Sequence, residues 1–287
     1  MTERIFLTFA DSRMAKARRR ICRQARAMKI YTKIIGASEA DLDEGFRKHF
    51  EKALVSEARG FGYFVWKIQL VKQTLDQMND GDVLHWVDAG NHLNPRGRWR
   101  LQEYFALAQT SPTGILGFQH RPPEGKLQYD GRALPDFAEY KYTKGDLIDR
   151  LQVRNNKDLL NQQQIGGNTF FIRKCTSSVA FVNEWLSLPY ENFSLIDNSP
   201  SVSPNIEGFI EHRWDQSIFS ILGKLHGITT LSCCECWYPG RDDCWKLDWE
   251  ALKDFPIHSK RDRGIPSEKN KIIWLKIKGK IKGILKI

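Results

Sequence analysis

The spacing of hydrophobic residues predicts that the chain opens with a parallel α/β unit. Residues 5–9 are an apolar run typical of a buried strand. Asp11 and Ser12, both good helix N-caps, follow it. Apolar residues then recur at helical spacing over 14–28, with arginines on the other face. A second apolar stretch at 31–35 completes the strand–helix–strand succession with which parallel sheets begin.

The later part of the chain continues this alternation of strands and helices. We expect helices over residues 42–58, 67–78, 99–109, 177–186 and 215–225, and strands over 82–87, 114–118, 169–172 and 229–232. Residues 121–142, which contain several Pro and Gly, predict a long loop of the kind that closes over ligands. The order of elements predicts an α/β fold, a mixed and mostly parallel Rossmann-type sheet flanked by helices, in one domain over residues 1–265.

Positive charge is concentrated in the remaining segment, 266–287, and just before it. The net charge is +10, and the residues from Lys260 onward include ten Lys or Arg and only two acidic residues. On a helical projection the apolar residues of 269–287 share one face and the lysines the other, which predicts a helix lying on an anionic membrane. An edge strand or a nucleic-acid contact are alternatives. Because nucleic-acid enzymes spread basic residues along the body, we expect no nucleic-acid partner.

The compartment follows from what the sequence lacks. It contains no secretory signal peptide and no apolar run of the roughly 20 residues that span a bilayer. Cys233, Cys234, Cys236 and Cys244 lack the paired spacing of structural zinc sites, so buried reduced thiols are expected. We therefore predict a cytoplasmic protein, peripheral on the inner face of the plasma membrane.

Candidate chemistry begins with Asp88, at the carboxyl end of a predicted strand, where open α/β sheets bind ligands. The small Ala89 and Gly90 would let a ligand approach, and the carboxylate could hold a divalent cation. A loop cap is the alternative. Asp215 and its neighbours lie at a helix start, which favours anions, although Asp215 could simply be the N-cap. Lys67 follows a run of glycine and aromatic residues and could bind an anionic ligand. A lysine exposed to solvent is the alternative.

Four blocks resemble, in order, motifs of bacterial glycosyltransferases from surface-polysaccharide and lipooligosaccharide gene clusters. They are RGFGYFVWKIQLVKQTLDQMNDGDVLHWVDAG (59–90), QIGGNTFFIRK (164–174), FIEHRWDQSIFSIL (209–222) and IHSKRDR (257–263). Their arrangement is also similar to the wider type-A (GT-A) glycosyltransferase fold. The resemblance implies a GT-A-like sheet and an enzyme of the hexosyltransferase type.

The resemblance also implies a metal site for Mn²⁺ or Mg²⁺ on the donor diphosphate. Asp88 matches the first Asp of the Asp-x-Asp motif, His258 matches the late His, and Gly90 stands where the second Asp would be. Asp88 and His258 are thus the expected ligands. As an alternative, Lys67, Arg261 and Arg263 would replace the charge of the metal.

By the same resemblance, further residues would bind a nucleotide-sugar donor or act on it. The donor-binding set is Thr8, Ala10, Asp11, Lys67, Asp88, Ala89, Gly90, Gly166, Gly167, His212, Arg261 and Arg263. Asp215 and Gln216 would face the reacting sugar. Asp215 would be the general base in an inverting enzyme, or would position the donor in a retaining one.

The expected reaction is transfer from a UDP-sugar to a lipid-linked glycan or a lipooligosaccharide or capsule acceptor. Two alternatives remain. A metal-dependent phosphohydrolase would need clustered Asp and His ligands for a metal pair, which the sequence does not display. The second is a non-catalytic membrane- or polyanion-binding protein with a degenerate transferase site. This would explain why Gly90 stands where the second Asp of the motif would be.

Overall fold

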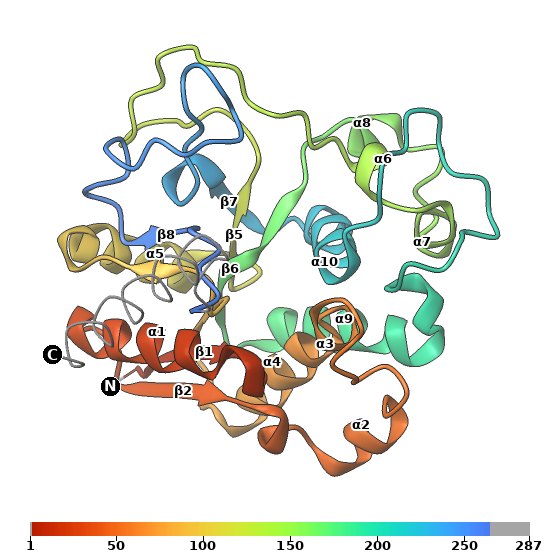
Figure 1. Ribbon diagram of the computed structural model, residues 1–287, viewed down its shortest axis with the longest axis horizontal. Coiled ribbons are helices and arrows are strands. Elements are labelled where there is room, and N and C mark those ends of the chain that lie inside the picture. The colour runs from red at the N-terminus through yellow and green to blue at the C-terminus, as the bar shows by residue number, and fades with distance from the viewer. Residues whose placement is uncertain (1, 265–287) are drawn as a thin grey trace, which may run out of the picture.

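The computed structural model describes residues 2–264 (Figure 1). The expected membrane-associating segment 269–287 lies outside the described residues, so the domain division at 265/266 stays a prediction. Within the described part of the chain, none of the helices is both long enough and apolar enough to span a bilayer.

A six-stranded sheet in the order β2-β1-β3-β6-β5-β7 forms the centre of the molecule. Its strands are β1 (Arg4–Phe9), β2 (Lys33–Ala37), β3 (Val83–Val87), β5 (Ile115–Gln119), β6 (Ile165–Arg173) and β7 (Thr229–Ser232). β1 pairs in parallel with β2 and β3, β5 pairs in parallel with β7, and β6 runs antiparallel between β3 and β5. The predicted mixed, mostly parallel sheet is confirmed.

Helices cover both faces of this sheet (Figure 1). α4 (Val65–Gln77), α9 (Thr176–Glu191) and α10 (Trp214–Leu225) pack on one face, and α1 (Ala15–Met28) and α5 (Arg98–Thr110) on the other. Side chains alternate along each strand to serve both layers. In β3, Leu84 and Trp86 join the first core, whereas Val83 and Val87 join the second.

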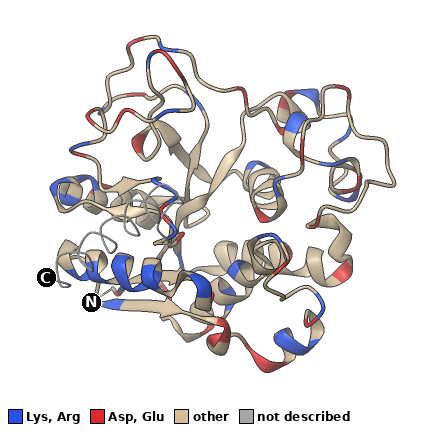
Figure 2. Cartoon of the chain, viewed as in Figure 1, with Lys and Arg blue, Asp and Glu red and all other residues tan. Residues whose placement is uncertain are grey.

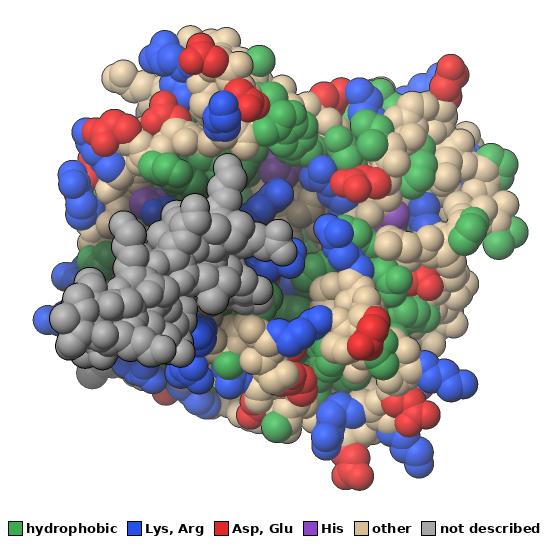
Figure 3. Space-filling model, in the orientation of Figure 1, with side chains coloured by type: hydrophobic (Ala, Val, Ile, Leu, Met, Phe, Trp, Pro, Cys, Tyr) green, Lys and Arg blue, Asp and Glu red, His purple; other side chains and the backbone are tan. Residues whose placement is uncertain are grey.

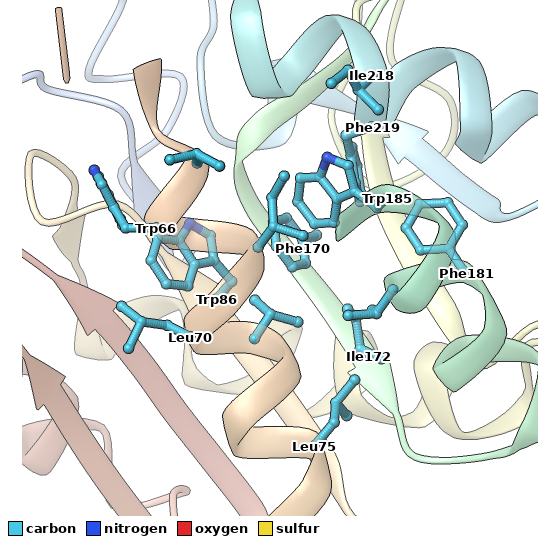
Figure 4. Close-up of a cluster of buried hydrophobic side chains, with 14 of the residues drawn as sticks. Trp66, Leu70, Leu75, Trp86, Phe170, Ile172, Phe181, Trp185, Ile218 and Phe219 are labelled. Atoms are coloured by element: carbon cyan, nitrogen blue, oxygen red, sulfur yellow. The ribbon is translucent and has the colours of Figure 1, made fainter. Parts of the chain in front are cut away.

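The first core is dominated by aromatic rings between the sheet and α9 and α10 (Figure 4). The rings of Phe170 and Phe219 stack with centroids 4.8 Å apart, and Trp185 lies 5.0 Å from Phe219. Trp86 reaches the same layer from β3, 6.2 Å from Phe170. This packing holds α9 and α10 against β6 and β3.

Short elements connect the layers. The helices are α2 (Glu44–His49), α3 (Gly60–Tyr63), α6 (Glu139–Tyr142), α7 (Gly145–Arg150) and α8 (Lys157–Leu160), with 3₁₀ turns at Ser12–Met14, Glu39–Asp41, Pro95–Gly97, Phe193–Leu195 and Cys233–Glu235. β4 (His92–Leu93) and β8 (Ile257–His258) form a separate two-stranded antiparallel sheet.

The helix predicted over 42–58 is wrong, because α2 ends at His49 and turns follow it. Beyond these turns, Phe61 and Gly62 in the short α3 and Phe64 after it have positive φ angles of 56°, 92° and 66°, outside the range of a right-handed α-helix, so α3 is an irregular turn. Tertiary contacts stabilise this irregular path. Trp66 donates from Nε1 to the carbonyl of Gly60 at 2.8 Å and stacks on Phe9, so the turns lie beside the end of β1.

Candidate functional site

The candidate site is organised around the ammonium group of Lys67, in the first turn of α4. This lysine is only 2% exposed. Its Nζ donates to Asp215 Oδ2 at 2.7 Å and to the Gly167 carbonyl at 2.9 Å, and it lies 3.4 Å from Asp88 Oδ1. The contact therefore joins α4 to the end of β3, to β6 and to the first turn of α10.

Strand pairing explains why these groups meet. Val87 of β3 stands opposite Thr169 of antiparallel β6, and the Asp88 amide donates to the Asn168 carbonyl at 2.9 Å. Gly167 then lies against α10, since a Cβ atom there would come within 3.3 Å of Gln216 Cβ and 3.5 Å of Asp215 Oδ2. A side chain at 167 would push the start of α10 away from Lys67.

The charges at this site differ in their access to solvent. Asp215 is buried, and burial raises its pKa to about 6 although the neighbouring Lys67 opposes the shift. Burial lowers the pKa of Lys67, but the charges of Asp215 and Asp88 and their hydrogen bonds outweigh it, so the net shift is upward. The Asp88 side chain is 33% exposed and accepts from Trp86 Nε1 at 2.9 Å. Asp88 is thus the carboxylate that a ligand can reach.

The segment that carries Arg261 crosses directly over the Asp88–Gly90 turn. The amide of Asp262 donates to the Gly90 carbonyl at 2.8 Å, and a Cβ at Gly90 would lie 3.4 Å from Arg261 Cα. Arg20 of α1 joins the two segments. It donates to the Ala89 carbonyl at 2.8 Å and pairs with Asp262 Oδ2 at 2.7 Å.

A cavity of about 190 Å³ opens beside this crossing. It is lined by Trp237, Trp245, Leu247, Ser259, Lys260 and Arg261. Figure 3 shows Lys and Arg side chains gathered around the hollow at the centre of the visible face. Indole rings suit the apolar faces of sugars, and guanidinium and ammonium groups suit phosphates. No motif pointed to Trp237, Trp245 or Arg20; the richness in aromatic residues was the only sequence signal for the cavity.

His212, predicted to bind the donor, makes hydrogen bonds to the backbone of neighbouring loops instead. Its Nε2 donates to the Leu195 carbonyl at 3.1 Å, and its Nδ1 accepts from the Lys144 amide at 3.4 Å. Burial lowers its pKa to about 3, so the ring is neutral. With both ring nitrogens bonded to backbone groups, His212 holds loops together. Gln216 similarly supports β6: its Oε1 accepts from the Gly167 amide at 3.2 Å.

The predicted residues at the end of β1 are held within the strand and the turn that follows it. Thr8 is fully buried within the strand, so its side chain is not open to a ligand. The Ala10 amide donates to the Ala37 carbonyl at 3.2 Å. Asp11 caps the turn at Ser12–Met14 and bonds to Arg13. Gly166 lies in β6 beside Gly167, and Arg263 is exposed.

The residues predicted to ligate Mn²⁺ or Mg²⁺ do not make a ligand set that fits either ion. Over residues 2–264, no cluster of three or more His, Cys, Asp or Glu side chains is placed to hold a metal. His258 donates from Nε2 to the Leu252 carbonyl at 2.8 Å, and Asp88 already faces the Lys67 ammonium. The four cysteines expected to be buried thiols are free; Cys233, Cys234 and Cys236 are buried, whereas Cys244 is only half-buried, contrary to the prediction.

Comparison with known proteins gives a likeness in fold. No family model and no curated protein matches the chain. One similar solved structure is a glycosyltransferase involved in the glycosylation of the major capsid of PBCV-1, with 12% identity over 89% of this chain and 91% of that chain and a TM-score of 0.43. Another is mouse xyloside xylosyltransferase 1 in its apo form, with 11% identity over 90% and 97% and a TM-score of 0.45. At these values the likeness concerns the path of the chain and assigns no residue a role.

Proposed function

We propose that the protein is a glycosyltransferase that moves a hexose from a nucleotide-diphosphate donor, UDP-linked, to a carbohydrate acceptor. One observation carries the proposal. The four sequence blocks that resemble glycosyltransferase motifs are far apart in the chain, and each contributes to this one site. Block 59–90 supplies Lys67 and Asp88, block 164–174 Gly167, block 209–222 Asp215, and block 257–263 Arg261.

The geometry suggests how these groups share the work in an inverting displacement. The acceptor oxygen forms a bond to the anomeric carbon, the bond from that carbon to the diphosphate breaks, and the hydroxyl proton passes to Asp88. Arg261 and Lys260 at the cavity would stabilise the charge that develops on the departing diphosphate. Because Asp215 is buried and bonded to Lys67, we assign it a positioning role instead of the general-base role expected from the sequence for an inverting enzyme.

For the acceptor we propose a lipid-linked glycan or a lipooligosaccharide or capsule precursor at the inner face of the plasma membrane. The basic amphipathic sequence of 269–287 supports this choice. Holding the enzyme on the surface that carries the acceptor would raise the effective concentration of that acceptor.

The test is acceptor-free hydrolysis of UDP-, GDP-, CMP- and dTDP-linked sugars, with an Asp88→Asn variant as the control. Release of nucleotide from one donor, lost in the variant, would establish the class of enzyme and name the donor. Absence of both hydrolysis and binding across the whole panel would refute the proposal.

Deleting residues 268–287 should release the protein from vesicles that contain phosphatidylserine. The lysines on one face of this segment each contribute about 1 kcal/mol near an anionic surface. Transfer to a soluble acceptor should be unchanged, because the proposed site residues lie before the deletion. Vesicle co-sedimentation measures the effect, with phosphatidylcholine vesicles as the control. Equal sedimentation of the full and shortened chains would exclude this segment as the anchor.

Nucleotide release should rise with pH through an apparent pKa of about 6. Asp215 is protonated below this value and ionised above it, and only the ionised form holds Lys67 as an ion pair. Activity should therefore be lost as the pH falls through about 6. Asp215→Asn, which cannot ionise, should stay at the low rate of the protonated form at every pH, whereas Asp76→Asn, which changes the surface Lys72–Asp76 pair of α4, should keep the wild-type rise. An identical rise in Asp215→Asn would assign the titration to another group.

A further inference from the structure

We propose that the Lys67 ammonium is a built-in cation that replaces a divalent metal, so that the site binds its nucleotide-diphosphate donor without a metal ion. This inference rests on the proposed function for its donor. Its claim about the cation can be tested without any nucleotide.

Three oxygen atoms of the site surround the ammonium group. Nζ donates to Asp215 Oδ2 at 2.7 Å and to the Gly167 carbonyl at 2.9 Å, and it forms an ion pair with Asp88 Oδ1 at 3.4 Å. The rings of Phe64 and Trp86 lie 5.4 Å and 5.6 Å from Nζ and add cation–π contacts. The cation is therefore enclosed by oxygen atoms and aromatic faces, much as a bound metal would be.

A divalent ion would have to displace this group. Mg²⁺ and ions like it need several oxygen ligands at about 2.0–2.6 Å. The two carboxylates that could supply them are Asp88 and Asp215, and both contact the ammonium. Asp88 Oδ1 also accepts from Trp86 Nε1 at 2.9 Å, which further reduces its capacity to bind a metal.

The predicted metal site also lacks its second carboxylate. Gly90 stands in that position and offers no side-chain ligand, and the backbone of Arg261 lies 3.4 Å from where its Cβ would be. His258 uses Nε2 to donate to the Leu252 carbonyl, which leaves Nδ1 as the one ring nitrogen that could bind an ion. Lys67 thus takes the place of the metal beside the two carboxylates, whereas Lys260 and Arg261, which line the cavity, would supply the positive charge that contacts the diphosphate.

The first experiment titrates the wild-type chain with Mn²⁺ and follows the ion by electron paramagnetic resonance, with no nucleotide present. We expect the wild type to bind no more Mn²⁺ than Asp88→Asn does. Lys67→Ala, which leaves Asp88 and Asp215 facing an empty space, should gain a site that binds Mn²⁺ at least about tenfold more tightly. Mn²⁺ binding by the wild type that disappears in Asp88→Asn would overturn the inference, as would a folded Lys67→Ala that gains none.

The second experiment measures UDP binding to the wild type by calorimetry, in EDTA and in Mn²⁺. Equal affinity in both conditions supports the inference, and a UDP complex that forms only with Mn²⁺ overturns it. If neither condition gives a UDP complex, the proposed donor is wrong, and the Mn²⁺ titration still decides the question of the cation. The wild-type measurements suffice if Lys67→Ala does not fold.

Discussion

Replacing Asp88 with Asn should lower nucleotide release at least about 100-fold, within the range that general-base catalysis contributes. The amide has nearly the same shape as the carboxylate but accepts no proton from the acceptor. The fold should survive, because the side chain is partly exposed and its oxygen can still accept from Trp86 Nε1. The rate of release from the active donor and the midpoint of thermal unfolding measure the two effects.

A matched control for this substitution is Asp76→Asn, which changes an exposed carboxylate paired with Lys72 on the far part of α4. We expect the activity of this variant to equal that of the wild type. Full activity in Asp88→Asn would remove Asp88 from the mechanism and return the role of base to Asp215. Loss of activity together with a large drop in the unfolding midpoint would mean that Asp88 acts by supporting the structure.

Replacing Lys67 with Met should lower the free energy of unfolding by about 3–5 kcal/mol at neutral pH, the usual cost of leaving a buried ion without its partner. Methionine fills a similar volume but leaves Asp215 charged and buried. The loss should shrink as the pH falls, since Asp215 can then take up a proton. Urea denaturation at several pH values measures it.

A double substitution separates charge from packing at this position. Lys67→Met with Asp215→Asn should regain most of the lost stability, because no buried charge is left unpaired, while activity stays absent. Lys72→Met, which breaks only an exposed pair on the same helix, should cost less than about 1 kcal/mol. If Lys67→Met costs no more than Lys72→Met, the ion pair contributes nothing to the folded state.

Much of the fold follows from the periodicity of apolar residues. The short, mostly apolar run of β3, which is buried throughout, and the regular apolar face of α1 are local signals, and the expected elements agree with the structure in these regions. The failure at 42–58 has a physical cause. The turns after His49 pack against the 60–64 segment, since a Cβ at Gly62 would come within 3.2 Å of the Ala53 carbonyl oxygen, and the positive φ of Gly62 is a backbone requirement that helical periodicity does not reveal.

The site was less accessible to sequence reasoning. The order of motifs indicated Lys67, Asp88, Gly167 and Asp215, but not that these groups contact one another. By itself Lys67 looked like a solvent-exposed lysine, and only the meeting of α4, β6 and α10 buries it. Arg20 could not be distinguished among the arginines of α1, whose basic outer face is evident in Figure 2.

The bonds of Arg20 also limit how the protein can be re-engineered. Its guanidinium contacts the carbonyls of Ala89, Asn91 and Asp262, so one side chain of the first helix is bonded both to the 88–91 turn and to the segment that ends the described chain. Chimaeras that take their first helix from one parent and residues 258–264 from another would break this connection even where every proposed ligand contact is preserved. Exchanges between related chains should therefore transfer α1, the 88–91 turn and the 258–264 segment together.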